Sequence, residues 1–417
     1  MENKKEIINL IGSKYCTGCE ACLSICPVHA ISMVEDDEGF KQPVIDINKC
    51  VKCSKCIKTC PISNNNSSSD ISEVKYYAAI NRNSEVRENS SSGGLFYLFA
   101  EYIIKNKGVV FGAKINDDFS VMHSYAETLD EVKKFQGSKY VQSQIGDSFI
   151  KCKEFLDKGI LVLFSGTPCQ IYGLKSYLSK KYENLFTIDV ICHGVPSTKI
   201  LKSYIKYQEK KAKSQAQQIA FRRKNFGWKQ YAIELLFNNS IAYCTPQTKD
   251  IWMLSFNKNV MLRQSCYNCN FKSVSRISDI TLADLWGIEF VAPELDDNKG
   301  TSLLMIQSEK GRLFFENLKK NLIYKTIDLD RIKRFNSFHQ TECPKNRDKF
   351  IKECFEKGFD KAYFKYVSEN LFLKVYRKIR RCLGKIKRLI YKLLGLSKEN
   401  SVKEIVSDLL ETGKNIE

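Results

Sequence analysis

Two stretches of the sequence share one cysteine pattern: residues 16–27 read CTGCEACLSICP, and residues 50–61 read CVKCSKCIKTCP. Each follows the spacing C-x-x-C-x-x-C-x-x-x-C-P, at which successive thiolates wrap round one 4Fe–4S cluster. Where two such runs share a domain, the fourth cysteine of each run binds the other cluster. We therefore expect two clusters, with the ligand sets Cys16, Cys19, Cys22 and Cys60 for the first and Cys50, Cys53, Cys56 and Cys26 for the second.

This doubled run resembles a bacterial-type ferredoxin domain, and its motif is complete. Zinc or a disulfide framework is the alternative for eight cysteines in so short a span. Zinc, however, takes four ligands at a time and requires neither the doubled spacing nor the prolines, and disulfides do not suit a cytosolic chain. Residues 1–10 do not resemble a signal peptide, so we expect a cytoplasmic protein whose thiols act as ligands.

Length and charge narrow the classes of protein to which this chain could belong. The 417 residues suggest two or three domains, and no apolar run is long enough for a membrane-spanning helix. The formal charge of +19 is uneven, because residues 361–417 hold fourteen Lys and Arg against six Asp and Glu. No recognised nucleic-acid-binding module accompanies this charge, so we expect no nucleic-acid partner.

The pattern of apolar residues predicts the order of the parts. We expect a ferredoxin domain over 1–62, a polar linker over 63–73, a body in two parts over 74–160 and 161–345, and a basic helical tail over 362–417. Strands alternate with amphipathic helices from residue 74, which indicates α/β organisation with part of the sheet parallel. The order is less regular beyond residue 217 and indicates an α+β portion. The strands that we expect span 74–80, 109–115, 119–125, 160–164, 185–190, 217–222, 230–237, 280–284 and 302–307, and the helices span 94–106, 147–158, 169–180, 198–210, 248–256 and 309–320.

Three polar loops of the body are placed where a nucleotide could bind. Ser90–Gly94 opens a helix, whose free N–H groups favour an anion such as a pyrophosphate. Gln136–Ser143 adds a lysine and a tyrosine, and Ser165–Gln170 follows a strand, where ligands of α/β sheets gather. Each loop taken alone is also compatible with an ordinary helix cap or a solvated turn.

Five motifs in one order resemble the beta-subunit family of coenzyme F-420 hydrogenases and dehydrogenases. They are SSGG (91–94), GSKYV (137–141), GTPCQ (166–170), CHGVPS (192–197) and SDITLADLWG (278–287). The resemblance covers about residues 74–340 and implies a mixed-sheet flavoprotein body that contains FAD. On this resemblance the FAD-binding residues are Ser91, Ser92, Gly93, Gly94, Ser138, Lys139 and Tyr140.

Four further cysteines suggest a third 4Fe–4S cluster. Cys266 and Cys269 form a C-x-x-C, and Cys169 and Cys192 each follow a predicted strand. The resemblance supports grouping these four, because relatives without the ferredoxin stretch are expected to keep a cluster here. Zinc at the same four thiols, or unrelated buried thiols, is the alternative. We expect the remaining cysteines to be packing residues: Cys152, Cys244, Cys343, Cys354 and Cys382.

His193 is the candidate catalytic residue, because imidazole titrates near neutral pH and can move a proton to or from a flavin or a substrate. A purely structural histidine is the alternative. Asp279, Asp284 and Trp286 either shape the flavin pocket or anchor a strand and its turn. Arg222 and Arg223 either meet an acidic substrate or form an exposed basic edge.

The tail from Phe372 combines an apolar stripe at helical spacing with a dense cationic face. Such a helix suits an anionic membrane surface, which would place the protein on the inner face of the cell membrane, and docking of the stripe on the body or on a partner helix is the alternative.

Two functions remain open. In the first, the chain is an oxidoreductase that passes electrons between 4Fe–4S clusters and FAD, which exchanges two electrons with a small-molecule substrate. In the second, it is a non-catalytic electron-transfer subunit that serves a partner enzyme. Either function needs a redox donor or acceptor protein. Coenzyme F-420 chemistry follows from the resemblance, although relatives use other acceptors and some occur among surface-polysaccharide synthesis functions.

Overall fold

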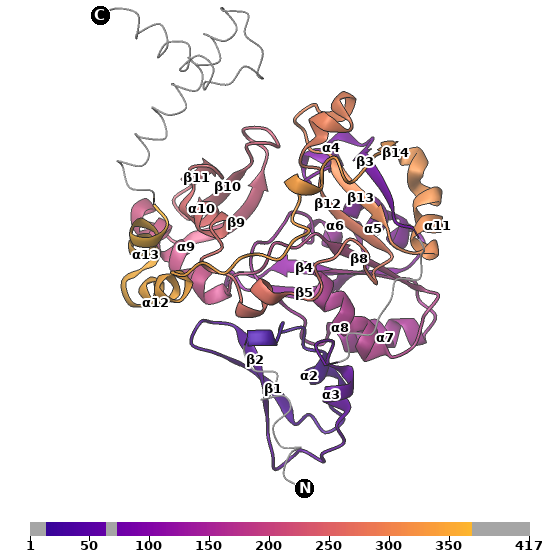
Figure 1. Cartoon of the computed structure of the whole chain (residues 1–417), viewed down its shortest axis with the longest axis horizontal. Coiled ribbons are helices and arrows are strands. Elements are labelled where there is room, and N and C mark those ends of the chain that lie inside the picture. The colour runs from indigo at the N-terminus through magenta and orange to yellow at the C-terminus, as the bar shows by residue number, and fades with distance from the viewer. Residues whose placement is uncertain (1–13, 64–72, 369–417) are drawn as a thin grey trace, which may run out of the picture. The chain divides into compact units, whose positions relative to one another are not determined.

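The computed structural model describes residues 14–63 and 73–368, and Figure 1 traces the elements in order. The predicted amphipathic tail lies outside these residues from position 369 onward. Residues up to Val367 form one compact unit, which the following paragraphs describe.

A nine-stranded mixed sheet organises the body. In spatial order its strands are β14 (Leu322–Thr326), β3 (Lys75–Asn81), β13 (Ser302–Ile306), β12 (Ile280–Asp284), β8 (Leu185–Val190), β7 (Val162–Gly166), β4 (Val109–Ile115), β5 (Val121–Ala126) and β6 (Ser143–Gln144). The four central strands, from β12 to β4, run parallel, and the flanking pairs are mostly antiparallel. The predicted mixture of parallel and antiparallel order is thus confirmed.

Helices cover both faces of this sheet because its central strands are apolar on both sides. In β7, Leu163 packs towards α5 (Leu95–Lys105) and α11 (Glu309–Leu318), whereas its neighbours Val162 and Phe164 pack towards α7 (Ser148–Asp157) and α8 (Pro168–Leu178). Alternate residues of a strand point to opposite faces, so one strand contributes to two cores. The carboxyl ends of β7 and β8 therefore carry their loops to one edge of a rigid layer.

A second core lies beside the large sheet. It joins the antiparallel sheet β11-β10-β9 to four helices. Its strands are β9 (Ala216–Arg223), β10 (Ala232–Phe237) and β11 (Ala242–Pro246), and its helices are α9 (Thr198–Ala212), α10 (Ile251–Asn257), α12 (Arg347–Lys357) and α13 (Phe359–Tyr366). Short elements complete the body: α4 (Ser84–Glu88), α6 (Leu129–Lys133), η1 (Gln264–Asn268), η2 (Ile288–Phe290), η3 (Pro293–Leu295), η4 (Lys319–Asn321) and η5 (Lys333–Phe335).

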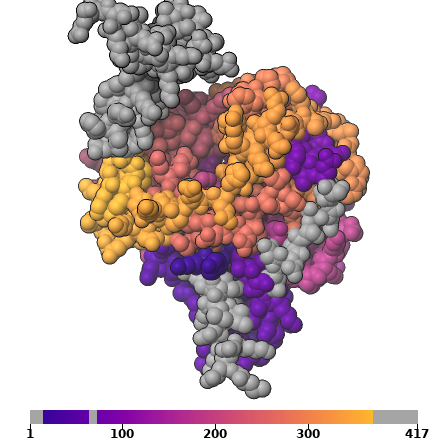
Figure 2. Space-filling model, viewed as in Figure 1, coloured from indigo at the N-terminus to yellow at the C-terminus, as the bar shows by residue number. Residues whose placement is uncertain are grey.

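The N-terminal domain consists of one hairpin and two short helices. The hairpin pairs β1 (Ile31–Glu35) with β2 (Lys41–Ile45), and the helices are α2 (Ala21–Ile25) and α3 (Lys55–Thr59). Helix α2 packs on α8 of the body, and Figure 2 shows the indigo domain meeting the body over a continuous surface. No helix among the described residues is both long enough and apolar enough to cross a bilayer.

Candidate redox site

The two cysteine runs of the N-terminal domain fold alike. Gly18 and Lys52 hold equivalent places in the two runs, and both have φ in the left-handed region, at 66° and 56°. Glu20 and Ser54, two residues further on, repeat this with φ of 60° and 59° and begin the helices α2 and α3. Left-handed residues at alternate positions make a loop turn tightly, and tight loops of this kind can direct their amides at an anionic group.

Thiols from both cysteine runs of this domain lie close together. Burial raises the pKa of Cys22 to about 12, and the nearby thiols of Cys16 and Cys60 raise it further. Burial also raises the pKa of Cys56, with Cys53 and Cys26 adding to the effect. Cys60 and Cys26 each lie near thiols of the other run, as the crosswise assignment expects, and Cys56 also lies near Cys22. Buried neighbouring thiols that disfavour one another's thiolates suit a cationic iron core, which would offset that repulsion.

A third group of thiols lies at the edge of the large sheet. Cys169 stands in the first turn of α8, Cys192 follows β8, and Cys266 and Cys269 belong to η1 and its end. All four line one cavity of about 490 Å³. Burial raises the pKa of Cys266 to about 12, and Cys192 and Cys269 contribute.

No three His, Cys, Asp or Glu side chains within residues 14–63 and 73–368 converge as one metal ion requires. Thiolates that ligate a cluster bind different iron atoms and can stand further apart.

The first and third thiol groups are neighbours. Burial raises the pKa of Cys169 well above its usual value, and Cys19 of the N-terminal domain is among the thiols that add to this shift. Gly173 lies one turn after Cys169 in α8, and a Cβ there would come within 3.1 Å of the Cys19 side chain. Glycine at this position therefore lets the N-terminal domain approach α8 closely.

The two loops expected to hold FAD line the same cavity as the third thiol group. Ser91, Ser92, Gly94, Ser138, Lys139 and Tyr140 contribute to its wall. Gly93 instead packs against the sheet, where a Cβ would lie 2.5 Å from the carbonyl oxygen of Ala79. The loops are joined because the Ser138 amide donates to Ser91 Oγ at 2.7 Å.

Lys139 is committed to its own loop. Its Nζ donates to the carbonyl oxygens of Phe135 (2.8 Å), Gln136 (2.9 Å) and Lys134 (3.1 Å). Burial lowers its pKa to about 7. The three carbonyl acceptors use all three donors of an ammonium group. This lysine therefore stabilises its own loop and adds positive charge to the cavity wall, but it has no free donor for a ligand.

A buried ion pair fastens the cavity wall. Arg222 donates to Asp284 at 2.7 and 2.9 Å, to Tyr140 Oη at 3.0 Å and to the Ser91 carbonyl at 3.2 Å. Its residue exposure is 7%, so the expectation of an exposed basic edge is wrong for Arg222. Burial opposes its charge and is the largest single effect, but Asp284, Tyr140 and Tyr231 together outweigh it, so the pKa of Arg222 is raised. Arg223 is half exposed and pairs with Glu234 at 2.9 Å.

Asp284 and Trp286 line the cavity, and Asp279 anchors β12. Asp279 accepts from the Thr187 amide at 2.8 Å and from Ser308 Oγ at 2.7 Å. Of the cysteines expected to pack, Cys152 and Cys354 are buried, as predicted. Cys244 is half-buried, Cys382 lies outside the described residues, and the prediction is wrong for Cys343, which is exposed.

His193 reaches the cavity but already has a partner. Its Nε2 is 2.6 Å from Asn259 Oδ1, and its ring lies against Phe256 with centroids 5.0 Å apart. Burial lowers the pKa of His193, so the neutral ring is favoured at neutral pH. A neutral imidazole can donate or accept a proton only through its two nitrogens, of which Nε2 is engaged.

His123 is a cavity residue that the sequence analysis missed. Its Nε2 donates to the Ser165 carbonyl at 2.9 Å, which leaves Nδ1 as an acceptor. Nδ1 is buried without a partner, although the residue is only 4% exposed and lines the cavity. Burial lowers its pKa to about 4, so the ring stays neutral. A buried acceptor without a partner marks a place where a ligand could donate a hydrogen bond.

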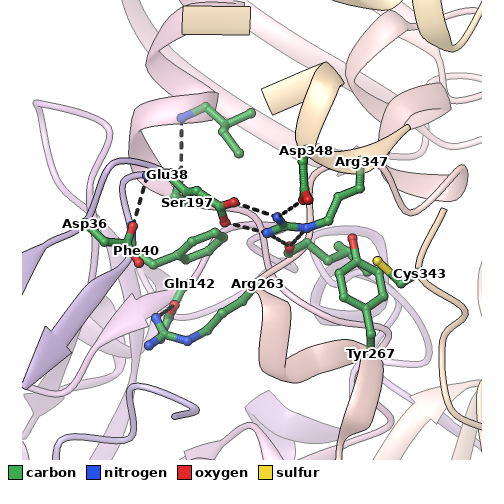
Figure 3. Close-up of polar contacts among 12 residues, drawn as sticks. Asp36, Glu38, Phe40, Gln142, Ser197, Arg263, Tyr267, Cys343, Arg347 and Asp348 are labelled. Atoms are coloured by element: carbon green, nitrogen blue, oxygen red, sulfur yellow. Dashed lines mark hydrogen bonds and ion pairs between the residues drawn. The ribbon is translucent and has the colours of Figure 1, made fainter. Parts of the chain in front are cut away.

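Two arginines of the body hold the N-terminal domain in place (Figure 3). Arg347 makes a bidentate pair with Glu38 at 2.5 and 2.6 Å. Arg263, only 1% exposed, donates to the Cys16 carbonyl at 2.8 Å and to Gln42 Oε1 and the Lys41 carbonyl, both at 3.0 Å. The Cys266 amide donates to the Arg263 carbonyl at 2.9 Å. One residue therefore bonds to ligand loops of both the first and the third thiol groups.

Two complete cysteine runs in one small domain indicate an iron–sulfur electron-transfer protein. Residues 15–64 match the 4Fe-4S dicluster domain family. Residues 160–332 match the family described as the C terminus of the coenzyme F-420 hydrogenase/dehydrogenase beta subunit. Residues 160–332 are therefore similar to the C-terminal part of this beta subunit, and the dicluster domain precedes them in the chain.

A solved structure, the xenon-derivatised F-420-reducing NiFe hydrogenase complex from Methanosarcina barkeri, is similar at 16% identity with a TM-score of 0.42. The similarity covers 70% of this chain and 90% of that chain. No curated protein matches the sequence.

Proposed function

We propose that this chain is an iron–sulfur flavoprotein oxidoreductase with a third 4Fe–4S cluster on Cys169, Cys192, Cys266 and Cys269 and with FAD in the adjoining cavity. The observation that carries the proposal is that these thiols and both predicted FAD loops line one space of about 490 Å³. This size is within the usual range of ligand pockets, about 300–1,000 Å³. A bound flavin would exchange one or two electrons and so join the clusters to two-electron chemistry.

The proposed ligand sets form a series. Cys53, in the second set, is exposed, Cys19 of the first set lies beside α8, and Cys169 of the third set faces the cavity. This order favours entry or exit of electrons at the N-terminal domain and exchange with substrate at the cavity.

The chain's own groups around the cavity would orient a flavin and exclude water. The Ser91 and Ser138 loops would face its polar parts, and His123 Nδ1 would accept from a ring N–H group. The ion pair of Arg222 with Asp284 would hold both loops in register. His193 remains our candidate for proton exchange, with Asn259 fixing its orientation.

A second cavity supports a place for the substrate. It measures about 920 Å³ and shares Ser91, Ser138 and Arg222 with the first cavity, and it adds Lys133 and Lys224 to its wall. Its wall also carries Glu85, Glu88 and Glu101, so its charge is mixed and does not by itself select the class of small molecule. Which compound binds, including a deazaflavin such as coenzyme F-420, is for reduction assays to decide.

Cofactor analysis after strictly anaerobic purification tests the proposal. We expect about twelve irons, matching sulfide and one FAD per chain, and about eight irons for Cys169→Ser. Cys152→Ser is the matched control, because Cys152 is a buried thiol outside all three groups. About eight irons in the wild-type protein, or zinc in the third set, would overturn the third cluster, and absence of FAD would overturn the flavoprotein.

The alternative is an electron-transfer subunit without a substrate of its own, which the words "beta subunit" in the family description favour. Direct reduction of the bound flavin by a deazaflavin or a nicotinamide would favour the enzyme. Reduction only through a partner protein would favour the relay. Membrane attachment through the tail stays a prediction, which sedimentation with anionic vesicles would test.

A further inference from the structure

We propose that the distal end of the N-terminal domain, defined as residues 27–29 and 46–58, is a docking surface for a small acidic protein that carries one electron at a time. The two segments are adjacent, since the Asp46 amide donates to the Ala30 carbonyl at 2.8 Å. The proposal rests on the dicluster domain alone, so it stands or fails independently of FAD and of the third cluster.

Exposed apolar side chains concentrate in this domain. Residues 14–63 contain six of the sixteen exposed large hydrophobic side chains, although they are only 50 of the 346 described residues. Three of the six lie on the distal end: Ile47 (65% exposed), Val51 (61%) and Val28 (36%). Clustered apolar groups ringed by polar residues mark protein interaction sites.

The same surface is strongly basic. Lys49, Lys52, Lys55 and Lys58 are all exposed, and no acidic residue occurs between positions 47 and 61. Lys49 pairs with Asp46 at 3.6 Å, on the edge of the surface. Such a surface attracts a partner with the opposite charge and speeds its encounter. The complementary partner is therefore acidic.

The position of the second thiol set indicates which cluster a partner on this surface would reach. Cys53 is the exposed cysteine of the two runs, and Lys52 and Lys55 flank it. The first set is instead turned to the body, where Cys19 packs beside Gly173. A protein docked on the distal end would therefore sit over the second cluster. Clusters pass single electrons, so a one-electron carrier suits them.

The test uses the full-length, cluster-loaded protein and a purified acidic bacterial ferredoxin, reduced beforehand, as the probe. Stopped-flow absorbance gives the second-order rate of electron transfer and its dependence on salt. For Lys52→Glu/Lys55→Glu we expect the rate at low salt to fall at least tenfold and its salt dependence to flatten. Ile47→Ser should slow transfer without changing the salt dependence.

Lys206→Glu/Lys210→Glu is the matched control, because these exposed lysines of α9 give the same change in net charge elsewhere. Redox titration of each variant separates a shifted cluster potential from weaker docking. Equal slowing in both double variants, or no slowing in either, would overturn the proposal. It would also fail if Lys52→Glu/Lys55→Glu lost binding to anionic lipid vesicles while ferredoxin reacted as before, since a membrane would then be the partner.

Discussion

Replacing Arg263 by methionine tests how the N-terminal domain is held against the body. The guanidinium donates three hydrogen bonds across this interface, to the Cys16 and Lys41 carbonyls and to Gln42. A hydrogen bond to a charged group contributes about 1.5–3 kcal/mol. Three bonds at the lower end of this range give about 4.5 kcal/mol, and methionine preserves much of the apolar contact with Phe40. We expect the opening free energy of the interface to fall by about that amount.

Hydrogen exchange followed by mass spectrometry measures this opening directly. A loss of about 4.5 kcal/mol corresponds to roughly two-thousandfold faster exchange for amides near residues 16–20 and 40–42 that exchange through interface opening. Arg223→Met is the control, because this exposed arginine has a single carboxylate partner and should cost no more than about 1 kcal/mol. If exchange near Cys16 rose less than fivefold in Arg263→Met, the interface would not depend on Arg263 and the reasoning would be refuted.

Three further predictions concern the cavity. Asp284→Asn should lower the free energy of unfolding by about 3 kcal/mol in chemical denaturation, because Arg222 would keep a buried charge without its carboxylate; a cost below about 1 kcal/mol would contradict this. His123 has a folded-state pKa of about 4 against an ordinary value of 6.5, so the unfolded chain binds more protons below pH 6.5 and stability falls as the pH falls. Between pH 7.5 and 5.5 the wild type should lose about 1 kcal/mol more than His123→Gln, and parallel stability curves would count against a buried neutral ring. His193→Ala should keep iron and flavin but lose turnover in steady-state assays, and unchanged turnover would remove its proposed role.

Local patterns in the sequence predicted most of the body. Strands β8 and β12 match their expected ranges, and the helices on both faces begin and end within a few residues of the predicted positions. These elements are set by apolar periodicity, which is a property of neighbouring residues. The edge strands β11 and β14 were missed, because half-exposed edges show a weak pattern. The cysteine sets were predictable for a similar reason, since cluster geometry fixes their spacing.

Local sequence patterns could not identify three residues of the site: His123, Arg263 and Arg347. Each stands alone in the sequence, and its partner is distant: Arg263 bonds to a carbonyl 247 residues away, and Arg347 to a carboxylate 309 residues away. His123 occupies an ordinary buried position of β5, and only the pairing of β4 with β5 and β7 brings it beside the Ser165 carbonyl. Such residues become visible only when the fold is known, because their chemistry depends on tertiary contacts.

The position of Arg263 links the contact between the N-terminal domain and the body to the redox properties of the first cluster. A buried positive charge beside the first thiol set stabilises the reduced form of its cluster, which is the more negative one, because net charge and nearby hydrogen bonds set cluster potentials. The second set is exposed at Cys53, and the neighbouring Lys52 and Lys55 are exposed too, so water screens their charges. The first cluster should therefore have the higher potential, which favours electron flow from the distal end towards the body. Arg263→Met should lower the potential of the first cluster and leave that of the second cluster unchanged, and an equal shift of these two would separate the role of this arginine in holding the N-terminal domain from any redox role.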